Sequence, residues 1–335
     1  MDKQRITIIG AGCIGASIGI ALRKSADAGH LEVVGHDRDL GTARNAQKLG
    51  AFDRTEFNLH LALAGAKLVI LAVPLSALRE VLADVGRLLD ANAGVVVSDT
   101  APLKAPVLQW ADELLPPGNH FVGADPFLAP GVGGWEPLST EGDARADLFA
   151  RAVYAITARA EDHPSAVRAV TNLALVLGAE PLFMNPAEHD AARLIGDAVP
   201  GIVAAALFQA TVEAPGWGEV RKAAGRAFAT ATSGAADMEP ISQRMMALLG
   251  QETLLRGLDA FQERLSALRG LIAEGNAEAL EQTLGNVSKA RAYWMAESRE
   301  RIWDIEQGST HQDGLFRRTM QALVGEVVIR KPRDS

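Results

Sequence analysis

Short apolar runs alternate with segments of helical period through the first half of the chain. Six runs predict buried strands: RITIIG (5–10), LEVVGHD (31–37), KLVILAVP (67–74), GVVVSDT (94–100), HFVGAD (120–125) and AVYAITA (152–158). A further helix and the short strand EPLFM (180–184) close the series. Strands that alternate with helices are typical of parallel sheets. The pattern therefore predicts an α/β fold, a Rossmann-like doubly wound parallel sheet domain over residues 1–184.

The second half of the chain has the period of helices instead. Three amphipathic segments cover residues 186–213, 241–275 and 276–305, and the second of them is long and rich in leucine. We expect an all-helical dimerisation and substrate domain over residues 185–335 that forms a homodimer. The final run GEVVIRKPRDS (325–335) is a short strand or a frayed tail, and its sequence does not choose between them.

Composition narrows the class of protein. The 335 residues are 48% hydrophobic with a net charge of -8, and no basic cluster offers a site for nucleic acid. The N-terminus has no apolar segment of the length of a signal peptide or membrane span, so we expect a cytoplasmic protein that does not enter membranes. Cys13 is the single cysteine, which excludes an internal disulfide, and no Cys/His spacing suggests a metal site.

A glycine-rich loop follows the first strand and opens a helix, as dinucleotide-binding loops do. Gly10 permits the tight turn, Gly12 admits the pyrophosphate, and Gly15 lets the helix approach the strand. Cys13 and Ile14 lie in the same loop, where we expect Cys13 to pack rather than to react.

Residues at the ends of later strands extend the predicted cofactor site. Asp37 suits the hydroxyls of an adenosine ribose and favours NAD over NADP, although the neighbouring Arg38 could meet a phosphate. Five other residues lie at the carboxyl edge of the sheet: Ala72, Val73, Pro74, Asp99 and Thr100. The first three suit a nicotinamide ring, and the last two either reach its ribose or cap the next helix.

Taken in order, these motifs resemble the prephenate and arogenate dehydrogenase family. The resemblance rests on GAGCIGAS, VVGHDRD, LVILAVPLSAL, VVSDTAPLK, HFVGADPF and GAEPLFMNPAEHDAARLIGDAVPGIVAAAL, and it covers roughly residues 6–272. It implies NAD- or NADP-dependent oxidative decarboxylation of a cyclohexadienyl acid by a Rossmann domain joined to a helical dimerisation domain.

The catalytic half departs from the family pattern. Where the family has a catalytic serine this chain has Pro102, and where it has the histidine that takes the proton of the ring hydroxyl this chain has Asp125. The family run Ser-His-x-Pro-His becomes Asp197 to Gly201, without either histidine. The family's substrate-binding arginine falls on Gly234, or on Arg226 if the loop is shifted. The sequence thus predicts a divergent member that lacks the catalytic serine and histidines.

Four residues remain as candidates for chemistry: Asp125, Lys104, His189 and Asp197. Asp125 could replace the histidine as general base if burial raises its pKa toward neutrality. Lys104 could hold a substrate carboxylate, act as an acid or be a solvated charge, and His189 could act in catalysis, cap its helix or pack the domain junction. Asp190, Arg193 and Asp197 share a helical face with His189 or lie one turn on, so they could line the cleft.

Three functions stay open. The first is an NAD-dependent oxidoreductase for a different cyclic or aromatic carboxylic acid, because a dianion would meet Asp125 and Asp197 without a basic residue at the carboxylate-binding positions. The second is a genuine prephenate or arogenate dehydrogenase of tyrosine biosynthesis. The third is an NAD-binding dimeric protein without catalysis.

Overall fold

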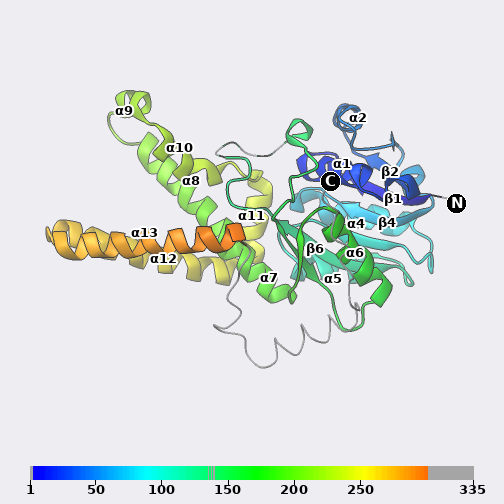
Figure 1. Cartoon of the computed structure of the whole chain (residues 1–335). Coiled ribbons are helices and arrows are strands. Elements are labelled where there is room, and N and C mark those ends of the chain that lie inside the picture. The colour runs from blue at the N-terminus through cyan, green and yellow to red at the C-terminus, as the bar shows by residue number, and fades with distance from the viewer. Residues whose placement is uncertain (1–2, 135, 137, 139, 301–335) are drawn as a thin grey trace.

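The structure, a computed structural model, describes residues 3–134, 136, 138 and 140–300. A sheet domain occupies one end, and a helical domain extends away from it as two arms (Figure 1). The predicted class, a Rossmann-like domain followed by helices, is confirmed. The question of a strand or a tail at 325–335 lies outside the described residues.

Eight strands form a single sheet in the order β3-β2-β1-β4-β5-β6-β7-β8. They are β1 (Gln4–Ile9), β2 (Leu31–His36), β3 (Arg54–Thr55), β4 (Ala66–Leu71), β5 (Val96–Asp99), β6 (His120–Phe127), β7 (Val153–Thr157) and β8 (Glu180–Phe183). All neighbouring pairs are parallel except β6 and β7, which are antiparallel. The expectation of a parallel sheet is wrong for this pair. Parallel neighbours need a crossover helix between them, and the described residues between β6 and β7 contain none, so β7 runs back alongside β6 in the opposite direction.

Helices cover both faces of the sheet. One face carries α1 (Cys13–Lys24) and α6 (Pro164–Val176), and the other carries α4 (Leu75–Leu88) and α5 (Ala105–Leu114). The smaller elements are η1 (Ala28–His30), α2 (Leu40–Lys48), α3 (Leu59–Leu63) and η2 (Glu141–Asp143). The short β3 and α3 are absent from the sequence prediction, since two and five residues are too few to show a period.

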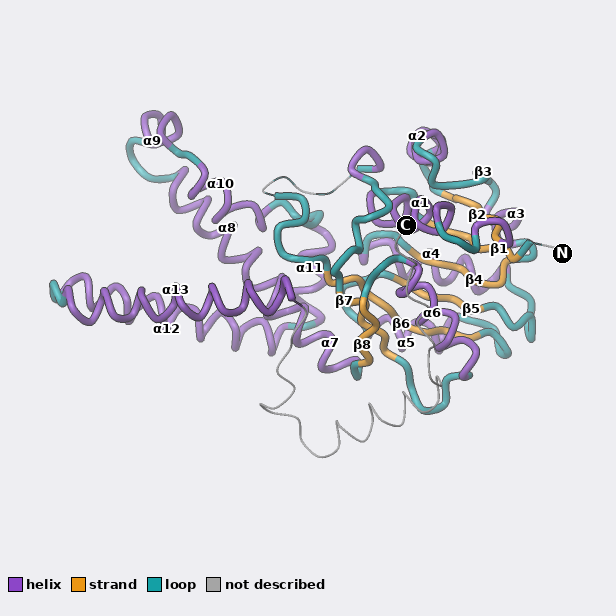
Figure 2. The backbone as a smooth tube through the Cα atoms, viewed as in Figure 1, coloured by secondary structure: helices purple, strands orange, loops and turns teal. Residues whose placement is uncertain are grey.

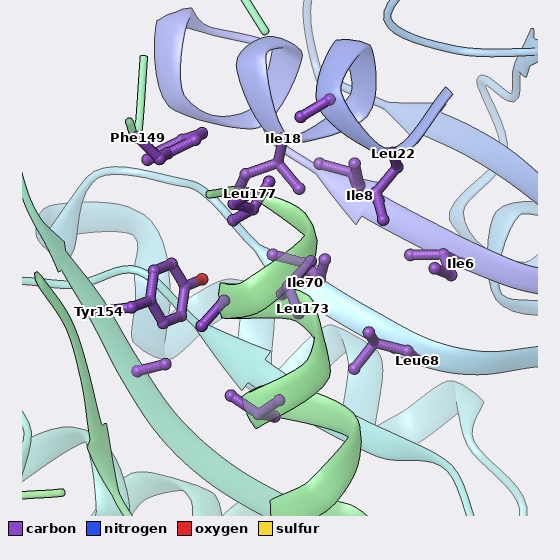
Figure 3. Packing of buried hydrophobic residues seen from close by; sticks show 14 of the residues in the cluster. Ile6, Ile8, Ile18, Leu22, Leu68, Ile70, Phe149, Tyr154, Leu173 and Leu177 are labelled. Carbon is purple, nitrogen blue, oxygen red and sulfur yellow. The ribbon is translucent and has the colours of Figure 1, made fainter. Parts of the chain in front are cut away.

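The apolar residues of the strands belong alternately to two cores, because successive side chains on a strand point to opposite faces of the sheet. Ile8 and Ile70 belong to the core under α1 and α6, whereas Ile9 and Leu71 belong to the core under α4 and α5. Figure 3 shows part of the first core, with residues of β1 and β4 packed beneath α1 and α6. The hydroxyl of Tyr154 is buried in this core and has no hydrogen-bond partner among the described residues.

The helical domain begins directly after β8. Its elements are α7 (Pro186–Arg193), a single π-helical turn η3 (Leu194–Ala198), α8 (Val199–Val212), α9 (Trp217–Ala223), α10 (Arg226–Thr232), η4 (Ser233–Ala235), α11 (Pro240–Leu249), α12 (Gln251–Ala273) and α13 (Ala277–Glu300). Figure 2 shows α12 and α13 side by side as one arm, with α8 to α10 as the other. The segment predicted as one helix from 241 to 275 is divided at Gly250, where a Cβ atom would lie 2.3 Å from the side chain of Leu194.

Many apolar side chains of the helical domain are exposed in the single chain. On α12 and α13 they include Leu265 (54% exposed), Ile272 (64%) and Val287 (59%). The described residues also contain one helical stretch, 186–212, that is long and apolar enough to cross a membrane, and it carries four charged side chains. Exposed apolar faces of this extent need a partner surface.

Candidate functional site

The glycine-rich loop has the geometry that its sequence predicts. Gly10 has a φ of +98°, and a Cβ there would lie 2.3 Å from the carbonyl oxygen of Ala72. A Cβ on Gly15 would lie 1.9 Å from the carbonyl oxygen of Gly10, so the start of α1 is pressed against the loop. Gly12 has no atom within 4 Å of its Cβ position, which leaves open space beside the helix N-terminus for a pyrophosphate.

Asp37 lies beside this loop at the end of β2. Its carboxylate accepts hydrogen bonds from the backbone N–H groups of Ala11 (2.8 Å) and Asp39 (2.9 Å), which hold it at the loop while leaving it partly exposed. Arg38 is exposed next to it. Cys13 is buried, and burial raises the pKa of its thiol, as suits a packing residue.

The other predicted cofactor residues divide into accessible and enclosed groups. Ala72, Val73 and Thr100 are half-buried and Pro74 is exposed at the carboxyl edge of the sheet, next to the loop. Asp99 is fully buried instead, and its carboxylate accepts from Ala101 N–H, Ala124 N–H and the ammonium of Lys104. The expected contact of the Asp99 side chain with a ribose is thus at odds with the structure.

Lys104 is also fully buried. Its ammonium donates to Asp99 and to the carbonyl oxygen of Ala124 (2.7 Å). Burial raises the pKa of Asp99 even though Lys104 opposes the shift. The alternative that Lys104 is a solvated charge is wrong, because its ammonium lies inside the protein and joins the ends of β5 and β6.

Asp125 lies at the end of β6 and is 2% exposed. Arg193 donates to both of its oxygens, from Nε to Oδ2 at 2.5 Å and from Nη2 to Oδ1 at 2.7 Å. The Nε2 atom of His189 lies 3.0 Å from Oδ2. The ring of Phe127 packs edge-on against His189 and lies 4.0 Å beneath the guanidinium of Arg193. The carboxylate is therefore enclosed by a cation, an imidazole and an aromatic ring.

The electrostatics of Asp125 oppose the sequence prediction. Burial raises its pKa, but the charge and hydrogen bonds of Arg193 and His189 outweigh burial and lower the pKa to about 2. The condition under which Asp125 could act as a general base, a pKa raised toward neutrality by burial, is not met, because the guanidinium of Arg193 faces this carboxylate. A general base of that pKa would be weak near neutral pH.

His189 is fully buried between two carboxylates. Its Nδ1 lies 2.9 Å from Asp190, and its Nε2 faces Asp125. A neutral imidazole can donate to only one of them, whereas the doubly protonated ring donates to both. Asp190 also accepts from the backbone N–H groups of Lys104 (2.5 Å) and Ala105 (3.0 Å) at the start of α5. The helical domain thus caps a helix of the sheet domain.

Arg193 and Asp197 form the accessible edge of this cluster. They are ion-paired four residues apart across the π-helical turn, with side chains 14% and 49% exposed. The structure adds a basic side chain to this cluster, because Arg193 of α7 lies against Asp125. The spacing of four residues between His189 and Arg193 predicts that both side chains lie on one face of the helix. That spacing does not predict which strand the face packs against.

Two glycines fill the place predicted for the family's histidine and arginine. A Cβ on Gly201 of α8 would lie 3.2 Å from the carbonyl oxygen of Gly234 in η4. A Cβ on Gly201 would therefore need its neighbour to move by a few tenths of an ångström, whereas a Cβ on Gly234 would be in ordinary contact, 3.5 Å from the Cα of Gly201. The sequence predicts two separate replacements, and the structure places the two glycines in contact with each other.

The Rossmann-like fold and the glycine-rich loop at the carboxyl edge of the sheet define a dinucleotide-dependent dehydrogenase with a helical second domain. No group of three or more His, Cys, Asp or Glu residues in the described ranges could hold a metal ion. Two family models match the chain: the nucleotide-binding domain of prephenate dehydrogenase over residues 18–181, and the dimerization domain of prephenate dehydrogenase over residues 185–286. The chain belongs to the prephenate dehydrogenase family. The predicted NAD(P)-dependent dehydrogenase class and the resemblance are confirmed at this level.

Individual relatives agree with this assignment. Prephenate dehydrogenase of Bacillus subtilis (strain 168) is 26% identical over 283 residues, which are 83% of this chain and 72% of the relative. Among solved structures, prephenate dehydrogenase from A. aeolicus in complex with hydroxyphenyl propionate and NAD+ has a TM-score of 0.75 at 22% identity, covering 88% of this chain and 99% of the other. Synechocystis arogenate dehydrogenase has a TM-score of 0.66 at 24% identity, covering 87% and 100%. The two structures support the fold.

Proposed function

We propose that this protein is an NAD-dependent dehydrogenase of the prephenate and arogenate class, with arogenate the favoured substrate of the two. The observation that carries the proposal is the cluster of Asp125, His189 and Arg193 at the carboxyl edge of the sheet. Although the family histidine on β6 is replaced, an imidazole and a guanidinium from α7 converge on the replacing carboxylate. A polar centre is therefore retained at the predicted catalytic position.

The cofactor assignment follows from the loop. Gly12 leaves room for a pyrophosphate, and Asp37 lies where a ribose would be bound and would repel a 2′-phosphate. The A. aeolicus relative contains NAD+, which agrees with this preference. When bound, NAD would accept a hydride from the substrate ring, and the residues of this chain would orient the two reactants.

The charges of the cluster favour an amino acid over a keto acid. Arg193 is neutralised by Asp125 and Asp197, and Asp237 lies close enough to Asp197 that burial and this neighbour raise its pKa. The accessible edge thus holds an excess of carboxylates. Prephenate is a dianion, whereas arogenate carries an ammonium group that can approach Asp197 or Asp237 favourably.

We assign the buried residues a positioning role, in which they do not contact the substrate. Asp125 and His189 are enclosed, so they position Arg193 rather than touch the substrate, and Asp197 is the accessible carboxylate. Lys104 fixes the ends of two strands beneath the cofactor.

A second candidate is the oxidation of a different cyclic or aromatic acid with NAD. The contact between Gly201 and Gly234 favours it, because glycines without side chains stand at the places predicted for a substrate-binding histidine and arginine. Pro102, in place of the catalytic serine, removes a hydroxyl from the same edge. A substrate with fewer carboxylates would suit this arrangement.

The test is the appearance of NADH fluorescence with arogenate, with prephenate and then with a panel of ring acids. We expect arogenate to have the highest kcat/KM. Turnover of another acid without arogenate turnover would support the second candidate, and tight NAD binding without any turnover would support a binding protein and contradict both. An Asp125→Asn variant with an unchanged pH profile would exclude Asp125 as general base.

We also propose a cytoplasmic homodimer formed through the helical domain. The match of residues 185–286 to a dimerisation domain and the exposed apolar side chains of α8, α12 and α13 support the dimer. The cytoplasmic location stays a prediction from the sequence.

A further inference from the structure

One cavity lies away from the cofactor edge. It has a volume of about 640 Å³ and lies at the amino ends of β1, β2 and β4, between α1 and α6. Volumes of roughly 300–1,000 Å³ are typical of small-molecule sites. The cofactor loop, Asp125 and Arg193 all lie at the carboxyl ends of the strands, so this cavity belongs to neither the dinucleotide site nor the catalytic cluster.

The floor of the cavity is apolar. Ile6 and Leu68 are paired across β1 and β4, and Leu22 and Leu173 contribute from α1 and α6. Figure 3 shows these four residues on the same side of the sheet. Each of them is less than 10% exposed, so the floor is a fixed part of the core.

Two cations stand at the rim, Lys67 at the start of β4 and Arg168 on α6. Both side chains are exposed, and neither has an ion pair or hydrogen bond within the described part of the chain. Asp27 is the one carboxylate that lines the cavity, and His30 stands near it. The two cations thus outnumber the acid in a protein whose net charge is -8.

The position of Lys67 results from an irregularity in the sheet. Arg5 pairs with Ala66 and Ile6 pairs with Leu68, so Lys67 is an extra residue in β4. Ala66 packs in one core and Leu68 in the opposite core, although residues two apart on a regular strand share a face. A bulge of this kind redirects a side chain. Here it lets the consecutive residues Lys67 and Leu68 line the same cavity.

We propose that this cavity binds a small monocarboxylic acid with an apolar body. The apolar part would cover Ile6, Leu68 and Leu173, and the carboxylate would meet the two unpaired cations, Lys67 and Arg168. Binding here does not depend on the reaction proposed for the cofactor edge.

The test is calorimetric titration of the full-length protein, saturated with NAD, with octanoate as the probe. We expect saturable binding that weakens at least tenfold when octanamide replaces octanoate, and at least tenfold in a Lys67→Gln/Arg168→Gln variant. The matched control is Arg79→Gln/Arg87→Gln, which removes two exposed arginines from α4 on the other face of the sheet. It should bind octanoate as the parent protein does.

An Ala169→Trp variant, which fills the half-buried wall of the cavity on α6, should abolish octanoate binding while leaving NAD binding unchanged. The proposal is overturned if octanoate does not bind the parent protein, if octanamide binds equally well, or if the Lys67→Gln/Arg168→Gln variant binds like its control. The glutamine variants alter only exposed positions, so the result does not depend on whether the tryptophan variant folds.

Discussion

Asp125 on β6 and Arg193 on α7 form a two-pronged ion pair, with nitrogen–oxygen distances of 2.5 and 2.7 Å. The pair joins the sheet domain to the helical domain and is almost fully buried, since the two side chains are 2% and 14% exposed. Among the described residues, Arg193 and His189 are the side chains that lie within hydrogen-bond distance of the Asp125 carboxylate. Stability and site geometry therefore depend on the same contact.

Replacing Arg193 by Met should leave a buried, unpaired carboxylate. We expect the free energy of unfolding to fall by about 3–5 kcal/mol, because breaking a buried pair from one side costs far more than removing both charges. The double variant Asp125→Asn/Arg193→Met should recover part of this loss. Urea unfolding at a fixed protein concentration measures both. Arg256→Met, which removes an exposed pair with Glu252, is the control and should cost about 0–1 kcal/mol. Equal effects of the two arginine substitutions would contradict the assignment.

Stability should depend on acid through Asp125. Its pKa is lowered from 3.8 to about 2 in the folded protein, so its contribution is fully present above the unfolded value and is lost as the pH falls through the folded value. The contribution amounts to roughly 2 kcal/mol at neutral pH. The difference in unfolding free energy between the parent protein and Asp125→Asn should hold from pH 7 to 5 and shrink between pH 4 and about 2. A difference that stays constant over that range would show that Asp125 does not titrate in this way.

Substitutions at two glycines of the cofactor loop should affect NAD binding and protein stability separately. Gly12→Val projects into open space, so it should change stability by less than about 0.5 kcal/mol. It should weaken NAD binding by at least about tenfold, or 1.4 kcal/mol, because the side chain occupies the place of the pyrophosphate. Gly15→Ala should instead lower the unfolding midpoint, since its Cβ would lie 1.9 Å from a carbonyl oxygen. Fluorescence titration with NADH and thermal unfolding measure the two effects. Unchanged NADH affinity in the Gly12→Val variant would show that the loop is not part of the cofactor site.

Charges placed on the exposed face of α12 should break the dimer. Leu265→Glu/Ile272→Glu puts two carboxylates where apolar side chains are 54% and 64% exposed in the single chain. We expect a monomer by light scattering, because burying these charges in an apolar interface is unfavourable. Leu49→Glu is the control, since Leu49 is 49% exposed but lies in the sheet domain, and this variant should remain a dimer. If the Leu265→Glu/Ile272→Glu variant stays dimeric, the dimer interface does not include this face of α12.

The sequence by itself determined the alternation of strand and helix, the phosphate loop and the change to helices after residue 184. These features depend on residues close together in the chain: the pattern of apolar positions, the spacing of Gly10, Gly12 and Gly15, and the acid at the end of the second strand. The resemblance to the family also led us to expect Pro102 and Asp125 where the family has a serine and a histidine.

Only the tertiary structure decided what those replacements mean. The lowered pKa of Asp125, the pairing of Lys104 with Asp99 and the contact between Gly201 and Gly234 each join residues that lie on different elements. The antiparallel β7 and the bulge at Lys67 depend likewise on which strand lies beside which. A carboxylate's charge state is set by the neighbours that the fold brings to it. Asp125 could therefore be singled out from the sequence, but whether it is a base or half of an ion pair required the position of Arg193.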